Sequence, residues 1–158
     1  MAVLSLLGKL CDAVACGDSS GYKGYALDLA SATHNLPGAT PLWMALSTNV
    51  AADYANSDET YQFHFAGGTG SDGTDINAGE AIHDETPAMN GNNAKLATAG
   101  NFIVRRTMDM AYRALRYFQL KYTQAGTSNA ITVDFNLSLW MPRTDYNIQV
   151  TASNVGLP

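Results

Sequence analysis

Residues 113–140 read RALRYFQLKYTQAGTSNAITVDFNLSLW, two runs of alternating apolar and polar side chains joined by a short polar segment. A period of two is typical of strands buried on one face, because successive side chains on a strand point to opposite sides. The joining residues 124–130 include glycine, serine and asparagine, which tolerate turn backbone. The stretch therefore predicts an antiparallel hairpin that other strands must cover. The residues expected to face the core are Phe118, Leu120, Tyr122, Ile131, Val133, Phe135, Leu137 and Leu139.

The composition predicts one globular domain and gives no sign of nucleic-acid binding. The chain has 158 residues, of which 46% are hydrophobic and 15% are charged, and its formal net charge is −5. An acidic chain lacks the electrostatic footprint of a nucleic-acid binder. Five of its nine Lys and Arg residues lie between positions 105 and 121, which indicates either a local basic patch or a solvated strand face. No apolar run reaches the 18 residues that a membrane-spanning helix needs.

Shorter alternating patterns recur along the chain and predict about eight strands separated by long polar loops. Residues 1–15 fit either an amphipathic helix or a strand, and their apolar run, broken by Gly8 and Lys9, does not fit a signal peptide. Many short strands with polar turns are typical of a sandwich or barrel, so we expect an all-β, jelly-roll-type antiparallel β-sandwich forming a single domain over 1–158. The other strands are expected near residues 25–29, 42–47, 61–65, 81–82, 102–105 and 146–150, with a glycine-rich loop at 67–79.

The two cysteines, Cys11 and Cys16, match neither a redox motif nor a metal-knuckle spacing. A disulfide between them would close a very small loop and add little stability. We therefore expect two free thiols, which weakly favours a reducing compartment.

The sequence predicts no catalytic site and no cofactor. It has no His-x-His pair for a cupin-type metal centre and no GxSxG motif for a nucleophilic serine. The segment Asp72–Glu80 carries four oxygen donors among glycines, which suits either a calcium site or an ordinary surface loop. His83, Asp84 and Glu85 are adjacent in sequence, so their side chains should diverge along an extended chain.

Three aromatic residues are expected on the polar side of their strands: Trp43, Tyr117 and Trp140. Tryptophan and tyrosine are common anchors of protein interfaces, so these side chains pack either beneath another part of the chain or against a partner.

Several stretches resemble the jelly-roll capsid cement (decoration) proteins of short-tailed bacteriophages. The main one is RYFQLKYTQAGT followed by ITVDFNLSL at 116–139, which is similar to their RYLRL-x-Y-x-x-x-GT hairpin. Further similarity lies in LCDAVAC near the N-terminus, in Leu27–Leu29 and in PLWMALSTNVAA at 41–52. Together these stretches cover about half of the chain, in the same order. The chain departs from the pattern by adding residues 140–158 after the last of them.

The resemblance implies a structural protein of the virion. Such a protein is made in the bacterial cytoplasm, binds the outer capsid surface and joins neighbouring major capsid protein subunits. It acts as a homo-oligomer, with a dimer favoured and a trimer possible, and needs neither nucleic acid nor membrane. Possible contact arms are residues 1–16 and 141–158.

The alternative is a carbohydrate-binding jelly-roll module that uses Trp43 or Trp140 as a stacking platform. The residues expected in capsid or self-association contacts are Trp43, Tyr117, Trp140, Arg143 and Tyr146.

Overall fold

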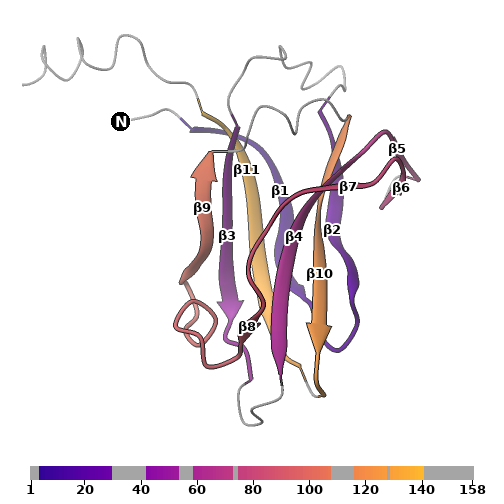
Figure 1. The fold of residues 1–158 in the computed structure, drawn as a ribbon. Coiled ribbons are helices and arrows are strands. Elements are labelled where there is room, and N and C mark those ends of the chain that lie inside the picture. The colour runs from indigo at the N-terminus through magenta and orange to yellow at the C-terminus, as the bar shows by residue number, and fades with distance from the viewer. Residues whose placement is uncertain are drawn as a thin grey trace, which may run out of the picture.

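The structure is a computed structural model that describes residues 4–29, 42–53, 59–72, 75–107, 116–127 and 129–140 (Figure 1). The described chain is all β and contains no helix, which confirms the predicted all-β sandwich. Its strands are β1 Leu4–Ala15, β2 Gly21–Asp28, β3 Leu42–Val50, β4 Thr60–Gly68, β5 Gly70–Ser71, β6 Ile76–Ala78, β7 Ala81–Glu85, β8 Met89–Asn90, β9 Phe102–Thr107, β10 Tyr117–Ala125 and β11 Thr132–Trp140.

Two antiparallel sheets form the two layers (Figure 1). The β11 sheet has the strand order β1-β11-β3-β9, and the β10 sheet has the order β2-β10-β4-β7, with β8 also paired to β4. Four of the antiparallel pairs join an early strand to a late one, and along the sequence each pair encloses the next. From the outermost pair to the innermost they are β1–β11, β2–β10, β3–β9 and β4–β7. The chain therefore passes repeatedly from one layer to the other, and its first and last described strands are neighbours.

The prediction of a hairpin within residues 113–140 is wrong, although both of its strands are present. β10 pairs with β2 and β4, whereas β11 pairs with β1 and β3 in the opposite sheet. In a hairpin, the apolar sides of both strands would need cover from elsewhere. By crossing between layers, the chain lets Phe118 of β10 and Phe135 of β11 cover each other, with ring centroids 6.1 Å apart.

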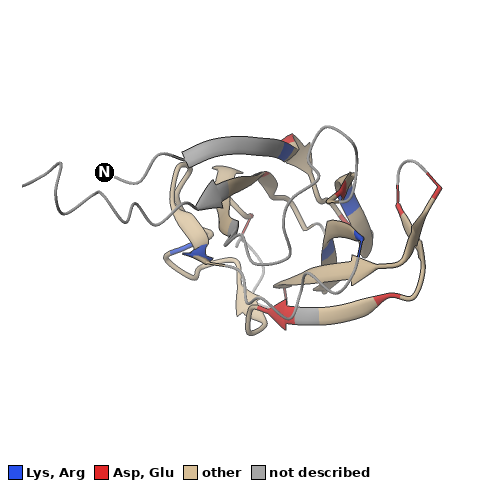
Figure 2. Cartoon of the chain, turned by 90° about the horizontal axis from the view of Figure 1, so that it is seen from above, with Lys and Arg blue, Asp and Glu red and all other residues tan. Residues whose placement is uncertain are grey.

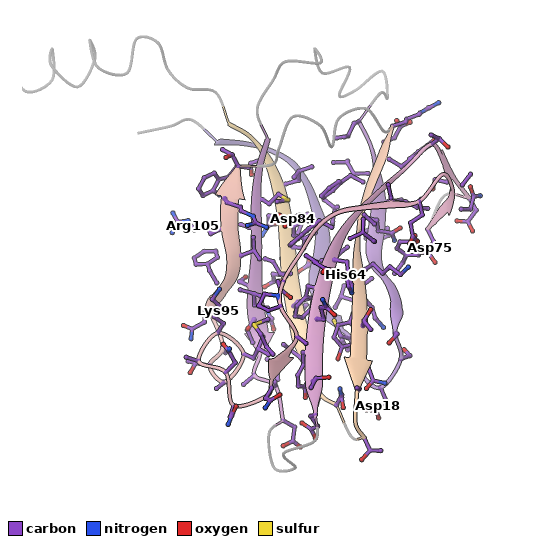
Figure 3. All side chains as sticks on the ribbon, in the orientation of Figure 1. Asp18, His64, Asp75, Asp84, Lys95 and Arg105 are labelled. Carbon is purple, nitrogen blue, oxygen red and sulfur yellow. The ribbon has the colours of Figure 1, made fainter. Side chains whose placement is uncertain are left out.

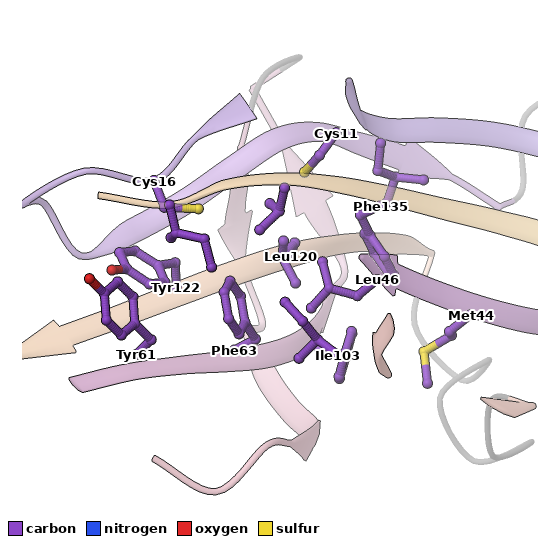
Figure 4. Close-up of a cluster of buried hydrophobic side chains, with 14 of the residues drawn as sticks. Cys11, Cys16, Met44, Leu46, Tyr61, Phe63, Ile103, Leu120, Tyr122 and Phe135 are labelled. Atoms are coloured by element: carbon purple, nitrogen blue, oxygen red, sulfur yellow. The ribbon is translucent and has the colours of Figure 1, made fainter. Parts of the chain in front are cut away.

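The core fills the space between the layers (Figure 4). Phe118, Val133 and Phe135 are fully buried, as expected from the alternation. Phe65 of β4 joins them, 5.5 Å from Phe135 between ring centroids. Cys11 and Cys16 are buried free thiols, which confirms the expectation from their spacing.

The ambiguous N-terminal segment forms a strand. Over Leu4–Ala15 it is β1, hydrogen-bonded to β11 at the border of its sheet. These residues belong to the expected contact arm at 1–16, whose role in contacts stays a prediction. Three register shifts interrupt the pairing, and Ala13 takes a left-handed φ of +49°. A residue with a Cβ pays about 1–2 kcal/mol for that conformation, so the bulge needs compensating contacts.

The glycine-rich segment 67–79 is not simply a loop. β4 continues to Gly68, and β5 and β6 then form a two-stranded ribbon. The predicted strands near 25–29, 42–47, 61–65, 81–82 and 102–105 are confirmed within β2, β3, β4, β7 and β9. The strand predicted at 146–150 and the arm at 141–158 lie outside the described residues.

Candidate functional site

The aromatic residues expected in contacts do not form one patch. Trp43 is half-buried on β3 and pairs in register with Ser138 and Thr107 in the β11 sheet. Tyr117 is half-buried at the start of β10, in the other layer, where Arg116 lies 5.1 Å from the centroid of its ring. The two side chains therefore belong to opposite faces of the sandwich.

The other three expected contact residues are placed in part or not at all. The backbone of Trp140 ends β11 and pairs with Leu4. Arg143 and Tyr146 lie outside the described residues.

The outer face of the β11 sheet is small and uncharged around Trp43 on β3 and β11, and carries charges at Lys9, Arg105 and Asp134. Met44, Leu46 and Phe135 are buried in the core, so the residues that alternate with them lie on the outside. In register across β3 and β11, Trp43 faces Ser138 and Ala45 faces Asn136. The part of the face around Trp43 suits contact with another flat protein surface, because its in-register neighbours Ser138 and Thr107 carry no charge that needs desolvation.

Asp134 borders this face and holds the bulge of β1 in place. Its Oδ1 accepts a hydrogen bond from the amide of Ala13 at 2.8 Å, and its Oδ2 accepts one from Asn49 Nδ2 at 2.9 Å. Lys9 Nζ lies 3.5 Å from Oδ1. Burial of Asp134 opposes its ionisation, but these donors outweigh it and hold the pKa of the carboxyl below its usual value. Asp134 is therefore a structural acid.

The outer face of the β10 sheet carries a polar network. His64 Nδ1 lies 2.8 Å from Glu85 Oε2, and His64 Nε2 lies 3.0 Å from Thr123 Oγ1. Lys121 Nζ donates to Glu80 at 2.7 Å. These partners come from β4, β7, β10 and the turn before β7, so the network ties neighbouring strands together.

The β5–β6 ribbon covers part of that face. Gln119 points to the outer side of β10 but is fully buried. Its Oε1 accepts from the amide of Ile76 at 3.0 Å, and its Nε2 donates to Asp75 Oδ1 at 2.9 Å and to Gly24 O at 3.2 Å. A Cβ on Gly68 would lie 2.0 Å from Ile76 Cγ2, so the ribbon sits directly on the strand.

The oxygen donors of the 72–80 segment have contacts of their own. Asp72 Oδ1 accepts from the amide of Asp75, Asp75 Oδ1 accepts from Gln119, and Glu80 pairs with Lys121. Among the described residues, no group of three or more His, Cys, Asp or Glu residues is arranged to hold a metal ion.

The basic residues between 105 and 121 do not form the single patch considered from the sequence. Arg105 and Arg106 lie on β9 in the β11 sheet, whereas Arg116 and Lys121 lie beside or within β10 in the other layer. Arg116 makes a bidentate pair with Asp28, at 2.9 and 2.7 Å. Figure 2 shows acidic and basic residues distributed around the outside of both layers.

A pocket of about 270 Å³ lies where the edges of the two sheets meet, between β9 and the segment 85–89. We call it the β9 pocket; Glu85, Met89, Lys95, Ile103, Arg105 and Arg106 are among its lining residues. Figure 3 places Lys95 and Arg105 along this side of the molecule. The sequence did not indicate the pocket, because its lining comes from segments that are separated along the chain. Of the lining residues, only the adjacent Arg105 and Arg106 belong to a feature that was noted in the sequence, the cluster of basic residues at 105–121.

Comparison with known proteins identifies no relative: no family model, no curated protein and no solved structure matches the chain. Within the described residues, no helix is long and apolar enough to cross a membrane. The conclusions about function therefore rest on the sequence and on the arrangement of the described strands.

Proposed function

We propose that this chain is a capsid cement protein: it binds the outer surface of a bacteriophage head and joins neighbouring major capsid protein subunits. The observation that carries the proposal is the nested strand order β1-β11-β3-β9 and β2-β10-β4-β7. We infer from the nesting that the sandwich is a jelly roll, an architecture used by many virion proteins. A fold alone does not fix a function, so the surface must fit the role as well.

The surface supports an adhesive role. The outer face of the β11 sheet offers Trp43 among small uncharged neighbours, whose desolvation costs little. On a closed symmetric shell the same weak contact is repeated many times, so each copy needs complementary surface and no chemical step. The resemblance of residues 116–139 to a sequence stretch of cement proteins points the same way, although β10 and β11 lie in opposite sheets here and form no hairpin.

The proposal includes the partners and the place of action. The chain associates with itself, as a dimer or a trimer, and with the major capsid protein on the outside of the virion. Trp43 belongs to the contact with the shell or with a second copy. Residues 141–158 supply a further contact arm.

The test uses shells assembled from the major capsid protein encoded in the same genome. The purified chain should sediment with these shells, and decorated shells should break at a higher temperature than bare ones. Trp43→Ala should weaken shell binding at least tenfold, since truncating a central aromatic anchor commonly costs about 2 kcal/mol or more. The matched control is Tyr25→Ala, which removes a 68% exposed aromatic side chain from the other layer. If the wild-type chain stays in the supernatant at every shell concentration, the proposal fails.

The alternative, a carbohydrate-binding module, rests on the same half-buried Trp43, because a flat indole also stacks on sugar rings. The two hypotheses differ in a simple observation. A cement protein should not change its melting temperature when glycans are added. A monomer whose melting temperature rises in a concentration-dependent way with one sugar would favour the carbohydrate module instead.

A further inference from the structure

We propose that the β9 pocket receives an acidic side chain from an extended segment of a partner protein, which lies along the edge strand β9. This inference assigns a second contact surface, which adjoins the outer face of the β11 sheet at Arg105 and Phe102. It does not require the partner to be a capsid subunit.

The pocket has an excess of positively charged side chains, so it should attract an anion. The chain as a whole has a net charge of −5, yet Lys95 and Arg105 both line the pocket and contact no carboxylate among the described residues. Lys95 Nζ donates to the carbonyl of Ile103 at 3.1 Å, and the Arg105 guanidinium lies 5.0 Å from the ring centroid of Phe102. Neither contact neutralises the cation.

The acidic side chains nearby are already engaged elsewhere. Glu85 lines the pocket, but its carboxylate lies against His64 on the outer face of the β10 sheet. Asp84 pairs with Arg106 and thereby links β7 to β9. A carboxylate entering the pocket would therefore meet two cations, Lys95 and Arg105, against one further acid of the lining, Glu85, which is turned toward His64. Charge-assisted hydrogen bonds of this kind are roughly twice as strong as neutral ones.

The size and lining of the pocket favour a side chain over a free small molecule. Its volume of about 270 Å³ lies below the range of about 300–1,000 Å³ that is usual for small-molecule sites. Two of its lining residues, Met89 and Ile103, are buried apolar side chains. An apolar surface beside two cations suits glutamate, which has two methylene groups before its carboxylate.

The edge strand β9 is suited to binding a partner segment in extended conformation. β9 lies at the border of its sheet and hydrogen-bonds only to β3 among the described strands. Edge strands bind extended peptides through their free backbone groups, while pockets for alternate side chains give specificity. The Lys95 amine already occupies the Ile103 carbonyl, so the incoming segment pairs along the later part of β9. Phe102, 47% exposed at the start of β9, provides an adjacent apolar contact.

The experiment is a titration of the isotope-labelled protein, followed by amide chemical shifts. The probes are three blocked nine-residue peptides in which valine and threonine alternate with glutamate, with glutamine or with lysine. The glutamate peptide should shift the amides of residues 85, 86, 88, 89, 95 and 102–107. It should also bind at least fivefold more tightly than the glutamine peptide, and the lysine peptide should not bind.

A pair of variants separates the pocket from general charge effects. Arg105→Gln should weaken binding of the glutamate peptide at least threefold, because an exposed cation of the pocket is lost. Arg116→Gln removes the same charge from the β10 sheet and should leave binding unchanged. The spectra of both variants show directly whether the fold is kept.

Three outcomes would overturn the inference. The first is equal binding of the glutamate and glutamine peptides, and the second is a set of shifts that lies away from β9. The third is that inorganic phosphate reproduces the same shifts at the same concentration, which would make the pocket a simple anion site. Failure of the chain to bind capsid shells would not affect any of these results, since no shell is present.

Discussion

At the scale of single residues, position within a strand predicted exposure well, but contacts changed the role of individual side chains. Asp134 alternates with core residues of β11, which by sequence alone suggests an ordinary solvated acid. In the structure it accepts hydrogen bonds from Ala13 and Asn49 and stabilises the left-handed bulge of β1. A residue from the end of the chain thus supports an unusual backbone conformation near its beginning.

Asp134→Asn should lower the free energy of unfolding by about 1 kcal/mol at pH 7. An asparagine with its oxygen in the Oδ1 position keeps an acceptor for Ala13 and Lys9, but it turns its amide nitrogen, a donor, toward Asn49 Nδ2, which is a donor itself. The folded-state pKa of Asp134 is lowered, so its stabilisation is fully present above the unfolded pKa of about 3.9 and is lost as the pH falls through the folded value. Urea unfolding of wild type and variant should therefore converge at low pH.

The control for this prediction is Asp12→Asn. Asp12 pairs with Lys9 on the same strand but is 74% exposed, so its removal should change stability little at any pH. If Asp134→Asn behaved like Asp12→Asn across the pH range, Asp134 would have no role in holding the bulge.

At the scale of elements, alternation identified the strands but not the positions where another element covers them. Gln119 falls on the polar side of β10, yet it is buried because the β5–β6 ribbon folds over that side. The glycine-rich composition of the ribbon predicted a loop, since short strands rich in glycine carry no hydrophobic period. Two hydrogen bonds, to Asp75 and from Ile76, join Gln119 to the ribbon segment, and a third joins it to Gly24 of β2.

Gln119→Leu should destabilise the protein by about 1–3 kcal/mol, because the buried amide of Ile76 loses its acceptor. The ribbon should loosen before the sheet does, so hydrogen exchange at residues 70–78 should accelerate more than exchange in β4 or β10. Gln62→Leu is the matched control. It removes a hydrogen bond to Thr86 in the same sheet and should leave the exchange of Ile76 unchanged. Equal acceleration in both variants would contradict the assignment.

At the scale of the whole molecule, the reactivity of the two thiols measures whether the two layers of the sandwich stay together. Cys11 and Cys16 are 0% and 1% exposed and lie within the shared core. Burial raises the pKa of each thiol to about 12, so almost no reactive thiolate is present near neutral pH. Modification therefore requires the two layers to separate.

We expect the native protein to resist iodoacetamide at pH 8, and both thiols to react at once after unfolding in guanidinium chloride. Under native conditions the rate of the slow modification should equal the rate for the unfolded protein multiplied by the equilibrium constant of unfolding, which urea titration measures separately, because the chain recloses faster than iodoacetamide reacts. Ser19→Cys places a thiol on an exposed turn and should react within the dead time of the native experiment. Rapid modification of wild type without unfolding would show that the layers open locally.

Sequence and structure contributed different parts of the candidate sites. Alternation placed Trp43 and Tyr117 on outer faces, and the structure assigns them to opposite layers. The charges at 105–106 were visible in the sequence, but Lys95 had no feature that linked it to them. The β9 pocket exists because β9, Lys95 and the segment 85–89 meet where two sheet edges adjoin.

The amino-acid sequence by itself determined the β class, the positions of the main strands and the inward sides of β10 and β11, including Phe118, Val133 and Phe135. These properties follow from the local alternation of apolar and polar residues, which a strand converts directly into two faces. Only the tertiary structure decided which strands pair within a sheet and which face each other across the core. The alternation does not settle this, because the apolar side of β10 could be covered by any sheet of matching shape. It is covered by β11 across the core, since that crossing buries the apolar sides of both strands at once.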